Sequence, residues 1–311
     1  MKQTSLGIPW PVVALGLLLL FILECGGEPR RAPVASQTTQ AIQSSTPSIF
    51  QSAQCLTDSW CWSHPSPTGN VLHKMWGSAS NDVWAVGWND TIVHWNGWRW
   101  ENALHPATSA SFYGVWGSSA QDVWVVGSAG TMLHYDGNAW TLTPTSTSNE
   151  LTKVWGSRAD DVWAVGAAGT QLHWNGVVWE AAATSTSSNL MSIWGSSSQD
   201  VWAVGTNGTM LHWDGGRWAT SATSTSVRLW SIWGTRSDDV WTVGDAGTAL
   251  HWDGSTWTSI STTGSSGLLG VYGLASNDVW AVGYSGTRIH WNGTSWSVVR
   301  TTVAAVLRAA I

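Results

Sequence analysis

The amino-acid sequence predicts an all-β fold, a six-bladed β-propeller built from four-stranded repeats of about 39 residues. Three observations lead to this prediction: an internal repeat, a hairpin signal in every copy, and tryptophan as the main aromatic residue. Self-alignment of the 311 residues gives repeats that start near residues 72, 112, 151, 190, 229 and 268. A period of about 40 residues with four strands per copy is the size of a propeller blade.

Each repeat divides into four short strands. In the repeat that starts near residue 190, residues 200–205 are β-branched and aromatic, and residues 209–213 alternate with period two. An Asn-Gly or Asp-Gly pair follows the third strand in every copy, at residues 96–97, 136–137, 175–176, 214–215, 253–254 and 292–293. Such pairs favour tight hairpins because they tolerate positive φ angles. These strands and turns exclude a helical solenoid, and a β-solenoid would not need a hairpin in every copy.

Both ends of the repeat region carry a clue to ring closure. Leu307 follows Trp296 by eleven residues, the usual spacing between a fourth strand and the next first strand. Upstream, residues 60–62 (Trp-Cys-Trp) precede Leu72 in the manner of a fourth strand. We expect one end of the chain to supply a strand that completes the blade at the other end. The alternative is a propeller of seven blades closed by both termini.

Tryptophan is the expected core material. The chain has 28 Trp, against 4 Tyr and 3 Phe. Twenty-two of the Trp fall into four aromatic positions of the repeat, and large apolar rings at repeated positions are expected to pack between blades. The second-strand position is Trp in all copies: Trp84, Trp124, Trp163, Trp202, Trp241 and Trp280.

A histidine and an aspartate also recur in all six copies. The histidines are His94, His134, His173, His212, His251 and His290, and an Asp precedes the Val-Trp of each second strand. We expect each His to bury its ring and to bond a neighbouring backbone group, and each Asp to close the preceding turn. A metal site would pair His212 with Asp214, but no copy offers three convergent ligands. We therefore predict no metal and no cofactor.

The N-terminal region is typical of an export signal. Lys2 precedes the apolar run of residues 8–23, and the sequence around Cys25 resembles the lipobox of bacterial lipoproteins, which implies lipidation of Cys25. Residues 1–25 are therefore expected to be a signal peptide, and residues 26–55, which are rich in Ser, Thr, Gln and Pro, a disordered tether. The propeller domain then spans residues 56–311. Cys55 and Cys61 are disulfide candidates in an oxidising compartment, with two free thiols as the alternative.

Charge excludes two classes of partner. Only 10% of the residues are charged, the net charge is −6, and the 13 Lys and Arg are scattered. The sequence therefore has no basic patch for nucleic acid or for an anionic membrane surface. Membrane contact is expected through the lipid anchor only, and the domain is expected to be a monomer.

No catalytic constellation is present in the sequence. Glu101, Glu150 and Glu180 are the only glutamates in the repeats, and we expect all three to lie in connections after a fourth strand. The sequence shows no pair of acidic residues outside the repeat pattern that could carry out glycoside hydrolysis. It also contains no Gly-x-Ser-x-Gly elbow and no phosphate-binding loop. The chain is therefore predicted not to be an enzyme, with no catalytic residues.

Residues 251–257, His-Trp-Asp-Gly-Ser-Thr-Trp, resemble a shortened Asp-box of the BNR type found in sialidases and photosystem II assembly factors. The whole unit is similar to Trp-rich propeller repeats of exported bacterial proteins and, more distantly, to tectonin-type lectins. The resemblance implies a propeller in an extracytoplasmic setting. Sialidases also need an arginine triad and a Tyr-Glu pair, which the scattered arginines of this chain do not match.

These observations predict an exported binding module anchored in the bacterial cell envelope, at the outer membrane or the cell surface, or else secreted. Its expected ligand is carbohydrate, bound in clefts between blades. The alternatives are a protein-interaction or envelope assembly scaffold that binds an envelope protein, and a degenerate sialidase-like hydrolase. The candidate ligand-binding residues are those that break the repeat: Trp88, Asn89, Asp90, Trp98, Arg99 and Trp230. Packing at the edge of the first blade is the alternative role for these residues.

Overall fold

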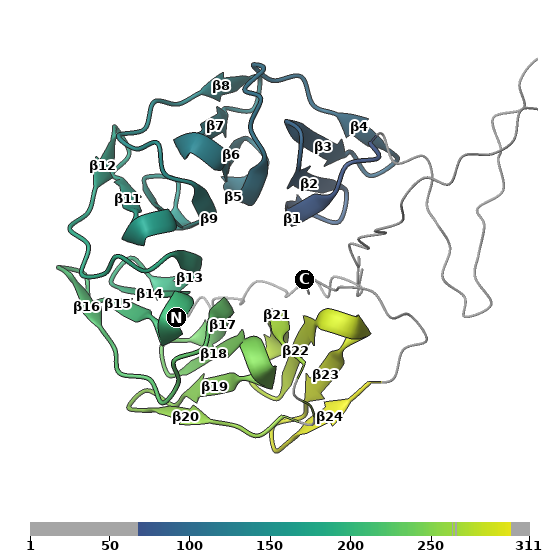
Figure 1. The fold of residues 1–311 in the computed structure, drawn as a ribbon. Helices are drawn as coiled ribbons and strands as arrows, with labels where there is room; N and C mark the ends of the chain where they lie inside the picture. Colours follow the sequence, from purple (N-terminus) through teal and green to yellow (C-terminus); the bar gives the residue numbers. More distant parts are fainter. Residues whose placement is uncertain (1–67, 263, 265, 300–311) are drawn as a thin grey trace, which may run out of the picture.

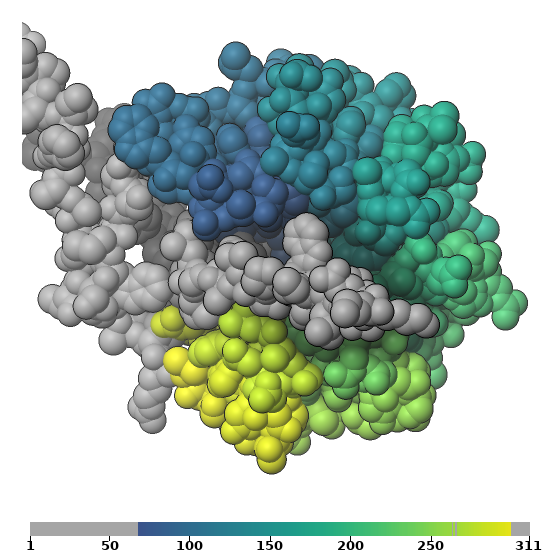
Figure 2. Space-filling view, turned by 180° about the vertical axis from the view of Figure 1, so that it is seen from behind, coloured from purple at the N-terminus to yellow at the C-terminus, as the bar shows by residue number. Residues whose placement is uncertain are grey.

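A computed structural model describes residues 68–262, 264 and 266–299, which form six four-stranded antiparallel sheets. The sheets follow one another round a ring in sequence order, as Figure 1 shows and as the order of colours in Figure 2 repeats from behind. The predicted six-bladed propeller is confirmed. The predicted signal peptide, lipidation site Cys25, tether and Cys55–Cys61 pair lie outside the described residues.

Each blade consists of four consecutive strands of one repeat. Blade 1 contains β1 (Leu72–Ala79), β2 (Asp82–Gly87), β3 (Thr91–Trp95) and β4 (Trp100–Asn102). Blade 2 contains β5 (Phe112–Ser119), β6 (Asp122–Gly127), β7 (Met132–Tyr135) and β8 (Trp140–Leu142). Blade 3 contains β9 (Leu151–Arg158), β10 (Asp161–Gly166), β11 (Gln171–Trp174) and β12 (Trp179–Ala181).

Blades 4 to 6 repeat this pattern. Blade 4 contains β13 (Leu190–Ser197), β14 (Asp200–Gly205), β15 (Met210–Trp213) and β16 (Trp218–Thr220). Blade 5 contains β17 (Leu229–Arg236), β18 (Asp239–Gly244), β19 (Ala249–Trp252) and β20 (Trp257–Ser259). Blade 6 contains β21 (Leu268–Ala275), β22 (Asp278–Gly283), β23 (Arg288–Trp291) and β24 (Trp296–Val298). Short 3₁₀ turns join the second and third strands of blades 2 to 6: η1 (Ser128–Gly130), η2 (Ala167–Gly169), η3 (Thr206–Gly208), η4 (Asp245–Gly247) and η5 (Tyr284–Gly286).

The strand order gives the ring two different faces. The first strand of each blade is the innermost, and the inner strands of successive blades pack against one another from β1 to β21. Because the strands are antiparallel, the turns between first and second strands and the hairpins between third and fourth strands lie on one face, here called the hairpin face. The turns between second and third strands and the connections between blades lie on the opposite face, here called the connection face.

The hairpins form where the sequence predicts them, but with a different turn. In the first hairpin Trp95 pairs with Trp100, so the connection has four residues, 96–99. Only the glycine adopts a positive φ, 87° at Gly97 and 87° to 92° over the six copies. The Asn or Asp instead accepts hydrogen bonds from the next backbone amides, as Asn96 does from the amides of Trp98 and Arg99 at 3.0 Å each. The Asn-Gly or Asp-Gly pair that recurs in every copy therefore combines a side-chain cap with a glycine in the left-handed region.

Tryptophan rings join each blade to the next, as predicted. The buried second-strand Trp124 meets Trp179, on the fourth strand of the next blade, edge to face at 5.2 Å. Trp116 lies over Gly156 of the next blade, where a Cβ atom would come within 2.6 Å of the indole ring. Glycine is therefore required at Gly156 because any side chain would displace the ring. These contacts recur at each of the five junctions from blade 1 to blade 6.

One expectation about closure was wrong. Each of the six sheets contains four strands of its own repeat, so none of the described blades lacks a strand for the far end of the chain to supply. The alternative of seven blades concerns residues 56–67 and 300–311, which lie outside the described residues.

Candidate functional site

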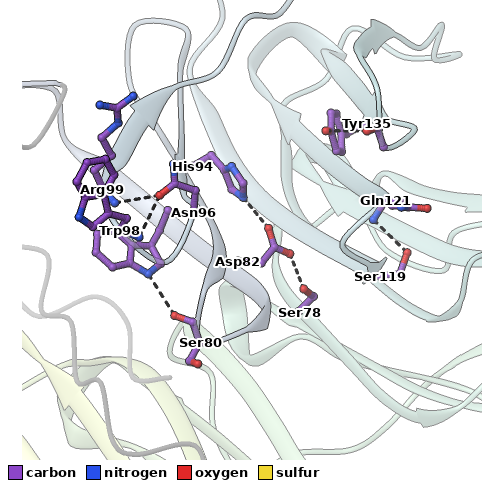
Figure 3. A network of polar contacts seen from close by, with 12 residues as sticks. Ser78, Ser80, Asp82, His94, Asn96, Trp98, Arg99, Ser119, Gln121 and Tyr135 are labelled. Carbon is purple, nitrogen blue, oxygen red and sulfur yellow. Dashed lines mark hydrogen bonds and ion pairs between the residues drawn. The ribbon is translucent and has the colours of Figure 1, made fainter.

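The recurring His and Asp form one side-chain network in every blade. In blade 1 the Asp82 carboxylate accepts a hydrogen bond from the Ser78 hydroxyl and lies 2.6 Å from Nε2 of His94 (Figure 3). The imidazole of His94 in turn stacks on Trp84 with ring centroids 4.0 Å apart. The His–Asp bond measures 2.6 to 2.7 Å in all six blades. The histidines therefore bond a carboxylate, which corrects the expectation that they bond the backbone.

The order of groups in this network differs from that of a nucleophile activated by a histidine. The carboxylate stands between the hydroxyl and the imidazole, so the histidine is not placed to remove the proton of the serine. For Asp200, burial acts to raise the pKa, but hydrogen bonds from His212 and Ser196 outweigh it and leave the pKa below its ordinary value. The Asp pKa is lowered in the same way in blades 2, 3 and 5. The network thus holds an ionised carboxylate that ties three strands together.

Blade 6 carries an incomplete network. Leu274 stands where the other blades have Ser or Thr, so Asp278 has no hydroxyl donor at that position. The indole Nε1 of Trp280 donates to Asp278 Oδ1 instead, at 3.0 Å. Within the described residues, no cluster of three or more His, Cys, Asp or Glu side chains is arranged to hold a metal ion. The same residues contain no helix with the length and apolar character needed to cross a membrane.

The structure separates the six candidate binding residues. Trp98 and Arg99 lie at the tip of the first hairpin, on the hairpin face, where the Trp98 side chain is 80% exposed (Figure 3). Arg99 pairs with Glu101. Trp88 lies on the connection face of blade 1, and Trp230 lies on the same face of blade 5, at the start of the inner strand. The six residues therefore do not form one site.

Asn89 and Asp90 shape the first blade. Both adopt positive φ, 53° and 60°, in the turn that replaces a 3₁₀ turn of the other blades. The Asp90 carboxylate accepts hydrogen bonds from the hydroxyl and the amide of Thr108, and Asn89 donates to Asn70 at 3.1 Å. Asp90 thereby anchors the connection to blade 2, which is one residue longer than the later ones. These contacts match the alternative role of packing at the first blade.

Another signal identifies a site: the repeat positions at which all six copies differ. Three such positions meet where the inner strand begins, on the connection face. One is the residue before the inner strand, the second is the second residue of that strand, and the third opens the turn after the second strand. We call these residues the rim: Val71, His73, Trp88, Ser111, Tyr113, Ser128, Glu150, Thr152, Ala167, Asn189, Met191, Thr206, Arg228, Trp230, Asp245, Gly267, Leu269 and Tyr284.

The remaining variable positions do not gather at the inner strands. All six copies also differ at the third residue of the hairpin loop and at the last residue of the fourth strand. These positions lie on the outer strand and its hairpin, and are mostly exposed. Only the rim therefore brings variable residues of successive blades together around the inner end of the ring.

Backbone geometry directs the rim side chains. In each inner strand the register with the second strand shifts across the second residue; Leu229 pairs with Gly244 and Ser231 with Val243, which leaves Trp230 in a β-bulge. The same register shift, between Leu72 and Lys74, places His73 at a β-bulge in blade 1. A bulge interrupts the ladder and re-aims the extra side chain. The fold thus presents one side chain per blade at the same place, and the residue type at this position differs in every blade.

Rim side chains of blades 1 to 3 contact one another. The His73 ring lies 5.5 Å from the Trp88 ring and 5.2 Å from the Tyr113 ring, measured between centroids. Burial, and then the negative charge of Glu150, raise the pKa of the Tyr113 phenol. An aromatic row that ends in a carboxylate therefore crosses three blades.

A second group lies on blade 5. The Trp230 indole Nε1 donates to Asp245 Oδ1 at 2.7 Å, and the Arg228 guanidinium lies over the Trp230 ring at 4.6 Å. The indole is therefore held between a carboxylate and a cation. Sequence reasoning singled out Trp230 as an extra aromatic residue but missed its neighbours, which the comparison of the six copies position by position would have found.

Two crevices of the described region are of another kind. One of about 330 Å³ is lined by Ser185, Asn207 and Thr223 among others, and one of about 370 Å³ by Thr262, Ser285 and Val298 among others. Neither has an aromatic residue in its lining. They therefore lack the aromatic platforms on which the prediction of carbohydrate clefts depends.

The ring, the repeated Trp contacts and the repeated His–Asp networks define a Trp-rich β-propeller. No protein-family model and no curated protein sequence matches this chain. Among solved structures, YCF48 bound to D1 peptide is 21% identical, with TM-score 0.63 over 82% of this chain and 88% of that chain. YCF48 from Cyanidioschyzon merolae is also 21% identical, with TM-score 0.62 over 78% and 88%. The WD40 propeller domain of Doa1 is 12% identical, with TM-score 0.64 over 77% and 86%. These likenesses establish the fold.

Proposed function

We propose that this chain is a non-enzymatic protein-interaction module whose rim binds an extended segment of a partner protein. The observation that carries the proposal is the rim itself, where positions that differ in all six blades are brought to one place. Packing between blades requires the same residues six times, so residues that never repeat are free to serve one specific site. A repeat scaffold with variable residues on one surface is a general solution for binding.

The chemistry of the rim suits a peptide. His73, Tyr113 and Trp230 offer aromatic surface, while Glu150 and Arg228 offer charges of both signs. Interfaces with proteins draw much of their affinity from Trp, Tyr and Arg, and charged groups fix orientation. One of the similar structures, YCF48, was solved with a D1 peptide bound. That complex supports the idea that a propeller of this kind takes a peptide ligand.

A selection from a displayed library of random peptides on the purified protein tests the proposal. We expect enriched peptides whose affinity falls at least about tenfold in Trp230→Ala and Tyr113→Ala, since interface hot spots cost about 2 kcal/mol or more on truncation. Trp98→Ala is the matched control. It removes a Trp that lies on the hairpin face and should leave the affinity unchanged. Failure to enrich any peptide, or equal loss in Trp98→Ala, would reject the rim as a peptide site.

Carbohydrate recognition is a second candidate, and one observation favours it. Trp98 is 80% exposed and the Arg99 guanidinium lies 5.6 Å from its ring, so one aromatic platform and one polar group stand together. A glycan array followed by titration tests this candidate. Binding at millimolar affinity or better that disappears in Trp98→Ala would support it, and the absence of any bound sugar would reject it.

Hydrolase activity is the third candidate, and the rim gives it no support. Its two acidic residues, Glu150 and Asp245, lie on blades 3 and 5 with blade 4 between them. Asp245 is bonded to the Trp230 indole and Glu150 lies close to the Tyr113 phenol. Two carboxylates that share one substrate bond must face each other across it.

The proposed setting is the cell envelope, with the propeller held on its tether by a lipid at Cys25. The proposal rests on the sequence of residues 1–55. Cells that express the full chain should incorporate labelled fatty acid into it, and Cys25→Ser should abolish the label. Incorporation that persists in Cys25→Ser would reject this anchor. Alkylation with and without reductant, followed by mass spectrometry, shows whether Cys55 and Cys61 form a disulfide.

A further inference from the structure

Lysine is rare in this chain, and two of its three lysines share one position of the repeat. Lys74 and Lys153 are the third residues of the inner strands β1 and β9, and Lys2 is the remaining lysine. The other four blades have Gly or Ser at this position: Gly114, Ser192, Ser231 and Gly270. The fold of a blade therefore does not require a positive charge at the third residue, and a small residue is the ordinary choice there.

The backbone directs the third residue of the inner strand toward the next blade. A Cβ atom added to Gly114 of blade 2 would come within 3.0 Å of the Lys153 Cα atom of blade 3. In blade 5 the Ser231 hydroxyl accepts a hydrogen bond from the Val271 amide of blade 6 at 3.3 Å. By the same geometry, the Lys74 side chain leaves its strand toward Gly114, which has no side chain. The inner strands β1, β5 and β9 follow one another around the ring (Figure 1), so only the inner strand of blade 2 separates the two lysines.

The positive charges of the two lysines act on each other. Burial lowers the pKa of the Lys153 amino group well below its ordinary value, and the charge of Lys74 lowers this pKa further. Both effects disfavour a charged lysine, whereas a carboxylate beside the amino group favours one. The arginines of the hairpin face are instead each paired with a carboxylate of their own blade, as Arg158 is with Asp160. Lys153 thus has a positive charge as its neighbour where these arginines have a negative one.

The two lysines lie next to the rim. Each directly follows a rim residue of its strand, His73 in blade 1 and Thr152 in blade 3. Their side chains are not fully enclosed, since both lysines are partly exposed. A segment that binds across the rim and directs a side chain or its end into the ring therefore comes within reach of both amino groups.

We propose that Lys74 and Lys153 form a carboxylate-binding site at the inner end of the rim, and that the partner segment carries an acidic group that both amino groups hold. The source of the carboxylate rests on the proposed function, because a protein segment supplies this group as an Asp or Glu side chain or as its C-terminus. A bound carboxylate favours the charged form of Lys153 and offsets the repulsion between the two lysines. The rim is therefore specific for acidic segments.

A titration with glutarate tests the site without any peptide. In the full chain labelled with ¹³C at the lysine Cε atoms, NMR gives one signal for each of the three lysines. Lys2→Arg and Lys74→Met assign two signals, and the remaining one belongs to Lys153. Glutarate should shift the Lys74 and Lys153 signals saturably and raise the pKa of Lys153, and glutaramide, its uncharged analogue, should shift neither. The absence of a saturable shift, or a shift with inorganic phosphate but not with glutarate, would overturn the carboxylate site.

Peptides selected on the purified protein test the partner. They should share an Asp, a Glu or a free C-terminus, and conversion of that carboxylate to the amide should lower the affinity at least about 30-fold, because a buried charge pair then loses one partner. A Glu-to-Gln change and an amidated C-terminus in separate peptides distinguish the two sources. Lys153→Met should lower the affinity as much and should bind the acid and the amide equally. Arg158→Met is the matched control, because it removes a positive charge from the other end of β9, and should leave the affinity unchanged.

The two experiments separate this inference from the proposed function. Peptides that bind the rim equally well as acid and as amide would overturn the carboxylate site and leave the proposed function standing. Saturable glutarate binding without any enriched peptide would support the site and overturn its assignment to a partner segment. If Lys153→Met does not fold, the comparison of acid and amide peptides on the unmodified protein decides.

Discussion

The hairpin face and the connection face of this propeller follow opposite rules. The networks that close the first turn of every blade repeat the same Asp and His six times, and only blade 6 lacks the hydroxyl donor. At the rim, by contrast, each of the three repeat positions has a different residue in every blade. The comparison teaches that repetition marks what each blade needs in order to fold, whereas divergence at a position that all blades share marks a position available for binding.

Trp202→Ala should give the largest effect on stability. Trp202 is 2% exposed and contacts Trp252 and Trp257 of the next blade, with ring centroids 5.1 and 5.3 Å apart. Removal of a buried Trp of this kind costs about 3 to 5 kcal/mol. Thermal and urea unfolding measure the loss. Trp230→Ala, one blade away, is the control. An equal loss of stability in Trp230→Ala would contradict the distinction between the repeated Trp and the rim Trp.

Asp200→Ala should have the next largest effect. It leaves the His212 imidazole and the Ser196 hydroxyl without their shared acceptor, and a lost buried acceptor costs about 1 to 3 kcal/mol. Urea unfolding measures the cost. Asp278→Ala in blade 6, where no hydroxyl donor is present, should cost less. A greater cost for Asp278→Ala would show that the network is not what stabilises the turn.

Acid should destabilise the propeller through the same carboxylates. The folded-state pKa of Asp122, Asp161, Asp200 and Asp239 lies below the ordinary value of 3.8. The unfolded chain therefore takes up protons first, so this stability is present above pH 3.8 and is lost as the pH falls through the folded-state pKa. Thermal midpoints between pH 6 and pH 2 measure it. The fall of the thermal midpoint with pH should be shallower in Asp200→Asn than in the unmodified protein. In the exposed control Glu180→Gln it should be as steep as in the unmodified protein. An equal slope in all three proteins would contradict the assignment.

Trp230→Ala should separate binding from folding. Its indole is partly exposed and bonded to Asp245, so its removal should cost no more than about 1 kcal/mol of stability, the worth of one net hydrogen bond. The affinity for a selected peptide should nevertheless fall by at least about tenfold. Calorimetric titration and thermal unfolding on one sample give both numbers. Unchanged peptide affinity in a folded variant would remove Trp230 from the site.

Asp253→Ala should have the smallest effect. Asp253 is exposed at the hairpin tip, where hydrogen bonds from the Thr256 amide and from Ser255 lower its pKa to about 2. Loss of this cap removes hydrogen bonds of one exposed turn, so the urea midpoint should shift only slightly and peptide affinity should not change. A shift as large as that of Asp200→Ala would mean that the hairpin face depends on its loops rather than on its networks.

The sequence predicted the ring because each blade repeats the same local rules. The period, the Asx-Gly hairpins and the second-strand Trp such as Trp202 are visible in the sequence alone. The partner of His212 was not predicted, because Asp200 lies 12 residues away and meets it only through pairing of the second and third strands. Trp98 and Trp230 both break the repeat, but their placement on opposite faces depends on the direction of the strands. The β-bulge that presents Trp230 has no sequence signal of its own.

Hydrogen exchange of the protein with and without a selected peptide tests the central claim most directly. Slowed exchange should appear at the starts of the inner strands on the connection face, around Tyr113 and Trp230, and the hairpin loops should exchange at unchanged rates. Slowed exchange at residues 96–99 and the equivalent hairpins, with the inner strands unaffected, would contradict the assignment of binding to the rim.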